Sequence, residues 1–507
     1  MAASYALHSA TLRGVEALPV TVEVHLSGGL PGMTVVGMPD NAVLEARARV
    51  RCALKSCGYD MPREHVTVNL APSDIRKVGT CLDLPIAVGI LAATSQLPRV
   101  GLDGCLFVGE LGLDGGVCAP RGSMAYALLA RDCRLALVAH REAAVICAGL
   151  GDGVCGLALS SLSQLKLGVD RLEPAREIAD EPDEADGDGL DYADVQDQEM
   201  AKRALVISAA GGHGMLMVGP PGSGKTMLAR RMPSILPALE EDARLESMLI
   251  HSVCSLPTTE LERGRPPFRA PHHSVSRAGL VGGGSPVRPG EVSLAHRGVL
   301  FLDELPEFSS GVLQSLRQPM EDGAVRIVRA EGSFSFPCEF QLLAAANPCP
   351  CGHAGDPGRT CRCSPAEVAR YQGKIGGALL DRIDVFVTVG RPSSKSVIRG
   401  SGGLSTRDMS SMVMEGREFS SWRAQKMAGD DVGKGKMSSL GLSDPAAGLL
   451  EGMANRLGLG GRAITRTARV ARTIADLARH EEVCEADVAE ACAFRSRLAG
   501  GGDDHDA

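Results

Sequence analysis

Residues 215–230 read MLMVGPPGSGKTMLAR and combine residue types that can bind the phosphates of a nucleotide. The apolar run 215–218 is typical of a short buried strand, and good helix formers follow Lys225. Between them lies the pattern G-x-x-x-x-G-K-T, in which glycines let successive backbone N–H groups point at one anion. The positive end of the following helix dipole adds to this attraction. We therefore predict a nucleotide site on a strand, a loop and a helix.

The positions of this loop have separate expected roles. Lys225 should reach the β- and γ-phosphates of ATP, and the hydroxyl of Thr226 should bind Mg²⁺. A chance glycine-rich turn is the alternative, but the strand before the loop and the helix after it both fit the nucleotide-binding context. The predicted ATP-binding residues of the loop are Gly219, Pro220, Pro221, Gly222, Ser223, Gly224, Lys225, Thr226 and Met227.

Two acidic residues follow the next strong strand signal. Residues 298–304 read GVLFLDE, so Asp303 and Glu304 are expected at the carboxyl end of a buried strand beside the phosphate loop. Asp303 can hold Mg²⁺ through its water shell, and Glu304 can orient and deprotonate an attacking water. The run QLLAAA at 341–346 predicts a further strand ending in Asn347. An asparagine alone is more typical of a turn, but at this strand end its amide can contact the γ-phosphate and the water.

Four cysteines form C-x-C…C-x-C in the segment PCPCGHAGDPGRTCRCSP that follows this strand. Cys349, Cys351, Cys361 and Cys363 can supply four thiolates at about 2.3 Å from a tetrahedral Zn²⁺, and His353 is a spare ligand. A structural zinc site is the favoured interpretation. Reduced thiols without a metal and disulfides are the alternatives.

The segment PPFRAPHHSVSRAGLVGGGSPVRPGEVSLAHRG holds two adjacent histidines and two arginines with glycines between them. His272 and His273 look like a metal pair, but neighbouring side chains diverge along an extended backbone, so a loop or interface role is favoured. Arg277 and Arg288 make a flexible basic stretch. We hypothesise that it contacts a DNA backbone, and a solvated loop is the equal alternative.

Length and composition limit the possible classes of protein. The 507 residues suggest about three domains, and 44% hydrophobic with 22% charged residues is an ordinary globular composition. A formal net charge of −8 excludes a globally basic nucleic-acid binder, so DNA contacts must come from local basic loops or a subunit pore. We see no secretory signal and no run of about 18 apolar residues, and expect no membrane association. Sixteen scattered cysteines beside a nucleotide site favour a cytoplasmic protein with reduced thiols.

The first domain alternates strand-type and helical runs, which predicts an α/β fold. Strands are expected at 20–25, 33–36, 65–70, 105–111 and 135–138, and helices at 41–56 and 84–94. Changes in composition then set the expected boundaries. We predict an N-terminal domain at 1–172, an acidic linker at 173–190, a P-loop domain at 191–392, a flexible connection at 393–442 with a polar helix near 408–427, a helical lid domain at 443–499 and a disordered tail at 500–507.

Residues 462–479 predict an amphipathic helix in the last domain, after a helix that starts near Ser443. Arg462, Arg466, Arg469 and Arg472 recur at helical spacing on one side, opposite an apolar side. We expect the arginines beyond Arg462 to form a solvated face.

The segments GLPGMTVVGMPD, VTVNLAPSDIRKVG, LDLPIAVGILAAT and FVGELGLDGGV, with the histidine-containing loop, resemble the YifB/ComM family of magnesium-chelatase-like AAA+ ATPases. The resemblance implies an α/β protein with an AAA+ P-loop domain, an N-terminal domain of the Lon-protease (S5-type) fold and a C-terminal helical lid. Lon-type proteolysis needs a Ser nucleophile and a Lys base. Cys81 stands near the nucleophile position. We interpret it as a small core residue and the domain as non-catalytic.

The resemblance also implies roles for single residues. Asn347 matches the sensor 1 position, and Arg462 matches sensor 2, which reaches the nucleotide. GALLDRIDV, residues 377–385, matches the segment that presents an arginine finger, so Arg382 is the candidate and a homo-oligomer, a hexameric ring in this family, is implied. An intrachain salt bridge of Arg382 with Asp381 or Asp384 is the alternative.

The segment before the phosphate loop departs from the family pattern. Asp197 and Gln198 stand where the family usually has Gly-Gln, which makes the pocket for the base less certain than the pocket for the phosphates.

The implied function is an ATP-hydrolysing motor that remodels DNA, a branch-migration helicase associated with natural transformation. A magnesium-chelatase-type ATPase subunit that drives metal insertion with a partner is one alternative, although it normally lacks a Lon-like N-terminal domain. A Lon-type ATP-dependent protease would need the missing Ser-Lys pair. A nucleotide-gated binding scaffold is the alternative outside the enzymes, and the acid pair with Arg382 argues for turnover instead.

Overall fold

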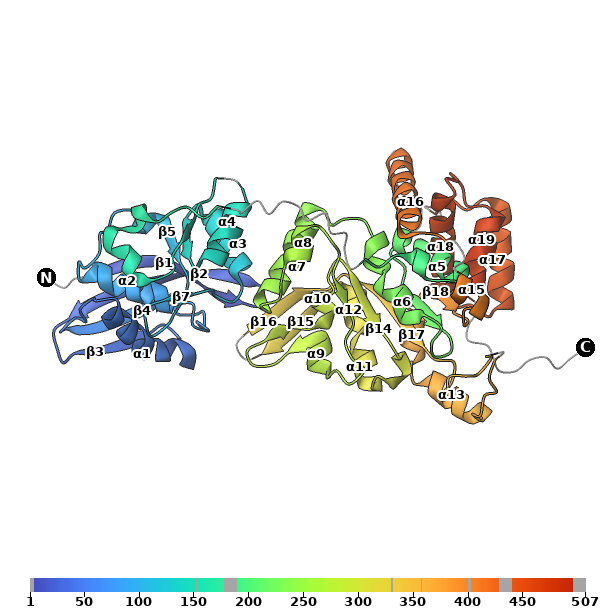
Figure 1. Ribbon diagram of the computed structural model, residues 1–507, viewed down its shortest axis with the longest axis horizontal. Helices are drawn as coiled ribbons and strands as arrows, with labels where there is room; N and C mark the ends of the chain where they lie inside the picture. The colour runs from blue at the N-terminus through green and yellow to red at the C-terminus, as the bar shows by residue number, and fades with distance from the viewer. Residues whose placement is uncertain are drawn as a thin grey trace, which may run out of the picture. The chain divides into compact units, whose positions relative to one another are not determined.

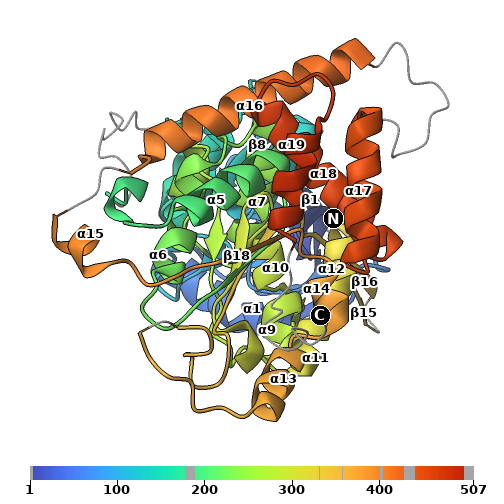
Figure 2. The same ribbon diagram turned by 90° about the vertical axis from the view of Figure 1, so that its right-hand side faces the viewer.

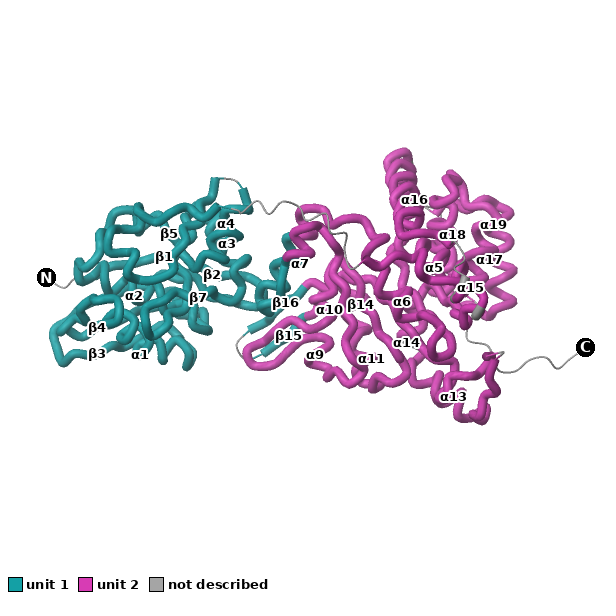
Figure 3. The backbone as a smooth tube through the Cα atoms, viewed as in Figure 1, with its two compact units in different colours: residues 1–184, 245–258, 326–336 teal, residues 185–244, 259–325, 337–507 magenta. Residues whose placement is uncertain are grey.

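The computed structural model describes residues 4–151, 153–176, 189–329, 332–356, 358–399, 403–427 and 440–495. The chain forms two units (Figure 3). Unit 1 contains Met1–Glu184, Leu245–Thr258 and Arg326–Phe336, and unit 2 contains Ala185–Arg244, Thr259–Val325 and Pro337–Ala507. Most of the predicted acidic linker 173–190 and the whole predicted tail 500–507 lie outside the described residues.

Unit 1 is built on a seven-stranded mixed sheet with the order β3-β4-β2-β1-β5-β8-β9. Figure 1 labels β1 to β5 of this sheet. The strands are β1 (Ser4–Arg13), β2 (Glu16–Ser27), β3 (Gly32–Val36), β4 (His65–Ala71), β5 (Cys105–Phe107), β8 (Ala136–Ala139) and β9 (Gly156–Ala158), with β6 (Glu110–Leu111) and β7 (Val117–Cys118) as a separate pair. The strands predicted at 20–25, 33–36 and 65–70 are confirmed. The run 105–111 is broken into β5 and β6, and β1, which pairs with β2 along its whole length, was not predicted.

The helices of unit 1 follow apolar spacing in the sequence. They are α1 (Asn41–Ser56), α2 (Asp83–Ala93), α3 (Ser123–Cys133) and α4 (Arg141–Gly149), with the 3₁₀ turns η1 (Leu102–Gly104), η2 (Leu162–Leu167) and η3 (Val169–Arg171). α1 begins after Asp40, whose carboxylate accepts the Val43 N–H at 2.9 Å. Its face of Val43, Val50 and Leu54 is buried at helical spacing. The predicted helix at 41–56 is confirmed, and the one at 84–94 is shifted by one residue.

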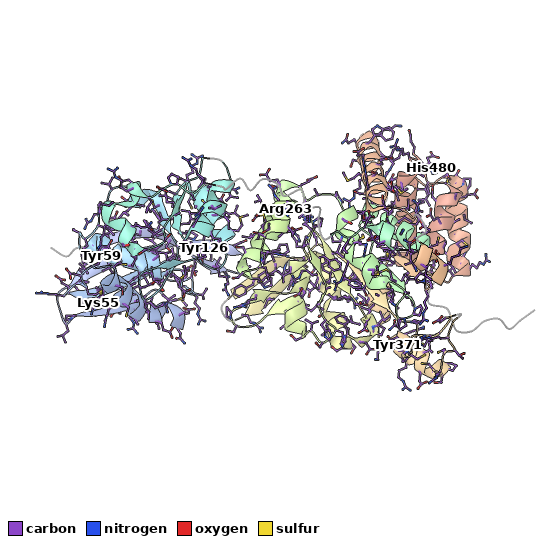
Figure 4. All side chains as sticks on the ribbon, in the orientation of Figure 1. Lys55, Tyr59, Tyr126, Arg263, Tyr371 and His480 are labelled. Carbon is purple, nitrogen blue, oxygen red and sulfur yellow. The ribbon has the colours of Figure 1, made fainter. Side chains whose placement is uncertain are left out.

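Cys81 lies in the core of unit 1, as predicted, with 7% of its surface exposed. Its Sγ donates to the Ala10 carbonyl at 3.6 Å, and burial raises the pKa of the thiol to about 11. The side chain of Tyr126 on α3, labelled in Figure 4, is buried and interacts with this thiol. A thiol with such a pKa is protonated at neutral pH and is a weak nucleophile, which favours the structural interpretation of Cys81.

Unit 2 is built on a five-stranded parallel sheet with the order β11-β14-β17-β10-β18. The strands are β11 (Phe268–Arg269), β14 (Val299–Leu302), β17 (Gln341–Ala346), β10 (Met215–Val218) and β18 (Val385–Thr388). Every residue of β10 and β14 is buried, which explains why these strands read as continuous apolar runs rather than alternating ones. The strands predicted at 215–218 and 341–346 have the predicted bounds.

Most of the remaining elements belong to unit 2, but residues 245–253 of α7 and most of the hairpin of β15 and β16 belong to unit 1. The helices are α5 (Glu199–Gly211), α6 (Lys225–Arg230), α7 (Glu241–Val253), α8 (Thr259–Glu262), α9 (Arg277–Val281), α10 (Glu291–Leu294), α11 (Ser310–Ser315), α12 (Arg317–Asp322), α13 (Pro365–Gly373), α14 (Gly377–Leu380), α15 (Ser394–Arg399), α16 (Thr406–Met427), α17 (Asp444–Arg456), α18 (Gly461–Leu477) and α19 (Glu485–Ala493). The 3₁₀ turns are η4 (Tyr192–Asp194), η5 (Met232–Ile235) and η6 (Leu305–Glu307), and the short hairpins pair β12 (Gly282–Gly283) with β13 (Arg288–Pro289) and β15 (Ala324–Arg329) with β16 (Gly332–Pro337). Among the described residues, no helix combines the length and the apolar character needed to cross a lipid bilayer.

The C-terminal helices confirm the predicted amphipathic helix but correct its basic side. Ser443 caps α17, and α16 packs against α5 and α18 (Figure 2) with Met409 and Val413 buried. We expected a solvated face, and this was wrong for Arg466 and Arg472. Arg466 contacts Asp384 at 2.9 Å, and Arg472 is buried and contacts Asp476 at 3.0 Å.

The physical reason for this correction is that α18 is covered on several sides. α5, α16 and α19 all pack against it, so the helix has no broad side facing water. Single-sequence periodicity locates the apolar stripe of such a helix, but it does not show which polar residues will meet partners from other elements.

A buried ion pair in unit 1 generates a test of its stability. Asp83, at the start of α2, has a side chain that is 1% exposed, and Arg49 Nε and Nη2 donate to its two carboxylate oxygens at 2.6 and 2.9 Å. Burial raises the pKa of Asp83, and Arg49 opposes that rise. Without Arg49 the carboxylate would be buried and uncompensated. We expect Arg49→Met to reduce the free energy of unfolding of unit 1 by about 3–5 kcal/mol at pH 7.5.

The pH dependence and a double variant check this prediction. The raised pKa of Asp83 favours its protonated form in the folded state, so stability is lost as pH rises through that pKa. The loss of unfolding free energy caused by Arg49→Met should therefore be smaller in acid. Arg49→Met with Asp83→Leu should recover most of the loss. Hydrogen exchange of peptides from α1 and α2 is the measurement, because the single tryptophan, Trp422, lies in unit 2. A loss below about 1 kcal/mol in the single variant would contradict the prediction.

Candidate functional site

The phosphate loop connects β10 to α6, as the sequence predicts. Gly224 has φ +91°, a left-handed conformation that favours glycine, and a Cβ on Gly219 would lie 2.0 Å from the Val389 carbonyl oxygen. Neither position accepts a side chain without a change in the backbone. The Ser223 hydroxyl is buried and has no hydrogen-bond partner among the described residues, whereas Met227 is 46% exposed.

Lys225 is the first residue of α6, and its side chain reaches back to the start of the loop. Its Nζ donates to the carbonyls of Gly219 at 2.8 Å and Pro220 at 3.0 Å, and to Oδ1 of Asn347 at 3.3 Å. Burial lowers the pKa of Lys225, while the charges of Asp303 and Glu304 raise it. The ammonium group is therefore held inside the loop by carbonyl oxygens and faces two carboxylates.

Thr226 and Asp303 meet although they are far apart in the sequence. The hydroxyl of Thr226 donates to Oδ2 of Asp303 at 2.7 Å, and Oδ1 of Asp303 accepts the N–H of Glu304 at 2.9 Å. A hydroxyl and a carboxylate are oxygen ligands of the kind that Mg²⁺ prefers, so the donor set fits this ion.

Glu304 directly follows Asp303 in the chain, but its side chain makes a different contact. Its backbone has φ +51°, an uncommon conformation for a residue with a side chain, and its side chain is 55% exposed. Oε2 of Glu304 lies 3.4 Å from Nδ1 of His273. The carboxylate is thus open to water on one side and close to an imidazole on another.

The structure does not bring Arg382 and Arg462 to the phosphate loop of the same chain. Arg382 precedes β18, so it lies at the amino edge of the parallel sheet, whereas the loop follows the carboxyl end of β10. Its side chain is buried and pairs with Glu321, a partner that the sequence did not predict. Burial, followed by the charges of Arg317, Arg466 and Arg462, lowers the pKa of Arg382, which places Arg462 near this group of arginines.

The departure at Asp197 has a structural explanation. Asp197 has φ +57°, a conformation that glycine adopts readily and that aspartate tolerates better than most residues. Its Oδ2 accepts the N–H of Ser393 at 2.8 Å. Gln198 then donates to the Gly390 carbonyl at 2.8 Å, so this segment stays attached to the chain that leaves β18.

The four predicted cysteines form one cluster. The Sγ atoms of Cys349 and Cys351 are 3.4 Å apart, each lies 3.6 Å from Sγ of Cys361, and Cys363 completes a group whose ligand atoms all lie within 4.8 Å of one another. Four sulfurs around a tetrahedral Zn²⁺ are separated by about 3.8 Å, so the residues fit this ion. Backbone N–H groups of Arg362 and His353 lower the pKa of Cys351 to about 6, which favours a thiolate.

The cysteine cluster lies beside the phosphate loop. A Cβ on Gly352 would lie 2.6 Å from Cδ of Pro221, so the two loops are in close contact. His353, the spare ligand, instead has Nδ1 at 3.3 Å from Asp356. Tyr371, labelled in Figure 4, is buried on α13 after the cluster.

The two adjacent histidines correct a sequence expectation. We expected their side chains to diverge, but the ring centroids of His272 and His273 are 4.0 Å apart. The backbone is not extended there, because the Val275 N–H donates to the His272 carbonyl at 2.9 Å and closes a turn. Arg277 and Arg288 are exposed, at the start of α9 and on β13.

Sequence analysis missed the contact between His273 and Glu304. β11 has only two residues, which is too short for a period to be recognised, so the loop after it was not placed in the sheet. Its parallel pairing with β14, with Arg269 opposite Leu300, sends both following segments to the same edge. The unusual PHH segment at 271–273, in the loop that follows β11, was the available signal.

Comparison with protein families divides the chain into three matched segments. Residues 22–141 match "Subunit ChlI of Mg-chelatase", residues 191–397 match "Magnesium chelatase, subunit ChlI", and residues 403–495 match "Magnesium chelatase, subunit ChlI C-terminal". The chain is therefore an α/β protein with a ChlI N-terminal domain, a magnesium-chelatase AAA domain on a parallel sheet and a C-terminal helical domain.

Two similar proteins cover nearly the whole chain. The competence protein ComM of Haemophilus influenzae is 41% identical over 501 residues, which are 97% of this chain and 97% of its own length. The YifB protein of Escherichia coli is 40% identical over 499 residues, 97% of this chain and 96% of its own length. A magnesium-chelatase 67 kDa subunit of Heliobacterium mobile is 28% identical over 191 residues, only 31% of this chain and 28% of its own length. The likeness over the full length shows that the chain belongs to the YifB/ComM family of magnesium-chelatase-like proteins.

Proposed function

We propose that this chain is an ATP-hydrolysing AAA+ motor. One observation carries the proposal: Lys225, Thr226, Asp303 and Asn347 are joined by short contacts at one edge of the unit 2 sheet, with Glu304 beside them. Transfer of a phosphoryl group to water needs donors for the phosphates, oxygen ligands for Mg²⁺ and a carboxylate for the attacking water. This group of residues supplies all three.

The phosphate loop would bind the triphosphate. Residues 219–227 offer backbone N–H groups, and Nζ of Lys225 would exchange its carbonyl partners for phosphate oxygens. Thr226 and Asp303 would hold Mg²⁺, which neutralises charge on the phosphates when bound. The 2.7 Å contact between their oxygens supports a shared role of the two side chains at one ion.

Glu304 would act as the general base. Its carboxylate is more than half exposed, so water can approach it, and it does not share the contact between Thr226 and Asp303. Asn347, held by Lys225, would orient the water and the γ-phosphate through its amide. These roles divide phosphate binding, metal binding and proton removal among different side chains.

The positions of Arg382 and Arg462 support assembly into a ring. Arg382 precedes β18, and Arg462 lies one turn before Arg466 on α18, which contacts Asp384 directly before β18, at the end of the sheet opposite the phosphate loop. We therefore assign them to the nucleotide of a neighbouring subunit, with Arg382 as the arginine finger after it leaves Glu321. A homo-oligomer, in the family a hexamer, follows from this assignment.

DNA is the substrate class that we propose for the motor. A relative is named a competence protein, and the exposed Arg277 and Arg288 offer a local basic surface on a chain with a formal net charge of −8. We propose that the motor drives branch migration of DNA in the cytoplasm. We also propose that unit 1 has a Lon-like fold without proteolytic activity. A magnesium-chelatase subunit is the second candidate, favoured by the three ChlI matches.

Substitution of Glu304 tests the ATPase. Glu304→Gln should retain ATP affinity and lower kcat by about 100-fold or more, because the amide cannot accept the proton of the water. Lys225→Ala should lose ATP affinity instead. The measurements are phosphate release and binding of a fluorescent ATP analogue.

A nearby carboxylate provides the matched control for Glu304. Glu307 lies on η6 with its side chain 44% exposed, and Glu307→Gln should keep kcat within about twofold. Undiminished turnover of Glu304→Gln would refute the assigned role of the base.

Elemental analysis tests the cysteine cluster. We expect about one Zn²⁺ per chain. Cys349→Ser with Cys361→Ser should remove it and, because Gly352 packs on Pro221, weaken ATP binding by about tenfold. Cys133→Ser, at an exposed cysteine of unit 1, is the control and should change neither quantity. A fully folded protein that binds ATP without zinc would end the proposal.

Salt dependence tests the basic surface. Arg277→Ala with Arg288→Ala should weaken binding of single-stranded and forked DNA and make the slope of log K against log salt less steep by about two. Arg263→Ala, at an exposed arginine labelled in Figure 4 that pairs with Glu260, is the control. An unchanged affinity and slope in the double variant would disprove this DNA contact. Stimulation of the ATPase by a metal-chelatase partner but not by DNA would favour the second candidate.

A further inference from the structure

Three side chains of different metal-binding types meet at the turn between α18 and α19 in unit 2. They are His480, labelled in Figure 4, Cys484 and Asp487. Nδ1 of His480 lies 3.3 and 3.2 Å from the two carboxylate oxygens of Asp487 and 3.9 Å from Sγ of Cys484. One ligand atom from each residue lies within 4.8 Å of the other two. Within the part of the chain that the structure describes, only the four-cysteine cluster forms another group of this kind.

The turn that carries these residues is held by its backbone. Arg472 of α18 is buried and donates to the carbonyls of His480 and Glu481. The carbonyl of Val483 accepts the N–H of Ser443 at 3.1 Å and its hydroxyl at 3.0 Å, and Ser443 is the residue that caps α17. Contacts with α18 and with the start of α17 therefore fix the turn without any contribution from a metal ion.

The spacing of Cys484 and Asp487 brings both side chains to the first turn of α19. Cys484 is the N-cap of this helix and Asp487 is its third residue, and residues three apart on a helix are neighbours. The N–H of Cys484 donates to Oδ2 of Asp487 at 2.9 Å. Serine or threonine caps a helix well through its hydroxyl, so capping alone does not require a thiol at this position.

Burial and charge at this turn suit a cation. The side chain of Asp487 is only 4% exposed, whereas that of His480 is 46% exposed, so an ion can enter from the side of the imidazole. Residues 481–485 include three exposed glutamates, which add negative potential. Arg472 acts electrostatically on Asp487, but its guanidinium is also paired with Asp476 at 3.0 Å. A buried carboxylate that is bound by a cation avoids the cost of an uncompensated charge.

We propose that His480, Cys484 and Asp487 form a second metal site, which binds Zn²⁺ or a chemically similar divalent transition-metal ion. This site is independent of the proposed ATPase function. Imidazole nitrogen, thiolate and carboxylate bind Zn²⁺ at about 2.0–2.3 Å, so tetrahedral ligand atoms of these types are separated by about 3.3–3.6 Å. The exposed imidazole can close the small remaining distance to Sγ by rotation about its side-chain bonds. Water would take the fourth position.

The ligand set predicts how this site differs from the four-cysteine cluster. Three protein ligands with one thiolate form an open site, so we expect dialysis against EDTA to remove its ion. Elemental analysis of dialysed protein then counts the four-cysteine cluster alone. Thiolate and imidazole favour Zn²⁺ over Mg²⁺, which prefers oxygen ligands. The bound ion would connect the turn after α18 to the first turn of α19.

Cobalt titration of the dialysed full-length chain tests the site. Co²⁺ can replace Zn²⁺ in such sites, and a thiolate ligand gives bound Co²⁺ an intense charge-transfer band in the near ultraviolet. With excess Mg²⁺ present, we expect about one thiolate-bound Co²⁺ per chain beyond any that the four-cysteine cluster takes up. Zn²⁺ should abolish this additional band, because it binds such ligands more tightly than Co²⁺.

Three variants assign the additional cobalt to its ligands. Cys484→Ser keeps an N-cap for α19 but removes the thiolate, and it should lower the number of thiolate-bound Co²⁺ ions by about one per chain. His480→Ala and Asp487→Asn keep the thiol and should each weaken cobalt binding by about tenfold or more. Cys133→Ser, at an exposed cysteine of unit 1, is the control and should leave the titration unchanged.

The same titrations can overturn the site. An equal band in Cys484→Ser would show that other thiols bind the cobalt. A loss in Cys484→Ser with unchanged affinity in His480→Ala would show that the thiol acts without the imidazole, and would equally refute the proposal. Because Asp487 also caps α19, Cys484→Ser and His480→Ala decide the result if Asp487→Asn lowers the melting temperature. Cys349→Ser with Cys361→Ser should keep the additional band, which separates this site from the four-cysteine cluster.

Discussion

The parallel register of β10, β14 and β17 is the constraint on which the candidate site depends. Val218 pairs with Ala346 and Leu302 with Ala344, so three strands deliver their following residues to one edge. A slip of one residue along β14 would move Asp303 by about 3.3 Å and reverse the faces of its neighbours. The 2.7 Å contact of Asp303 with Thr226 would then be lost. The backbone hydrogen bonds between the strands thus fix the positions, along the strand direction, of residues that are far apart in the chain.

The parts of this arrangement that are local in sequence could be predicted. β10 and β17 are continuous apolar runs with polar residues directly after them, and their bounds came from that contrast. The same holds for α1, where Asp40 and the apolar spacing specify both the start and the buried face. The four cysteines lie within one loop, so their proximity also followed from the chain itself.

The parts of the site that depend on the order of strands in the sheet could not be predicted from the sequence. Nothing in the sequence of the two-residue β11 shows that it lies beside β14, so the contact of His273 with Glu304 was not visible. Arg382 pairs with Glu321 of α12, and Arg472 is buried where α18 meets other helices. In each case the partner comes from an element whose position is decided by tertiary packing.

The residues proposed to act in ATP hydrolysis lie at opposite ends of the strands of the unit 2 sheet. The phosphate loop and Glu304 follow the carboxyl ends of the strands, whereas Arg382 precedes the amino end of β18. Four residues of strand separate these edges by about 13 Å. Because Arg382 is also buried against Glu321, its guanidinium cannot serve the nucleotide of its own chain without leaving that pair and crossing the sheet. A second copy that presents its amino edge to this carboxyl edge removes the distance, and the ion pair with Glu321 must still be broken. The proposed mechanism therefore makes hydrolysis a property of the assembled subunits, and Glu321 a competitor that the neighbour's triphosphate must displace.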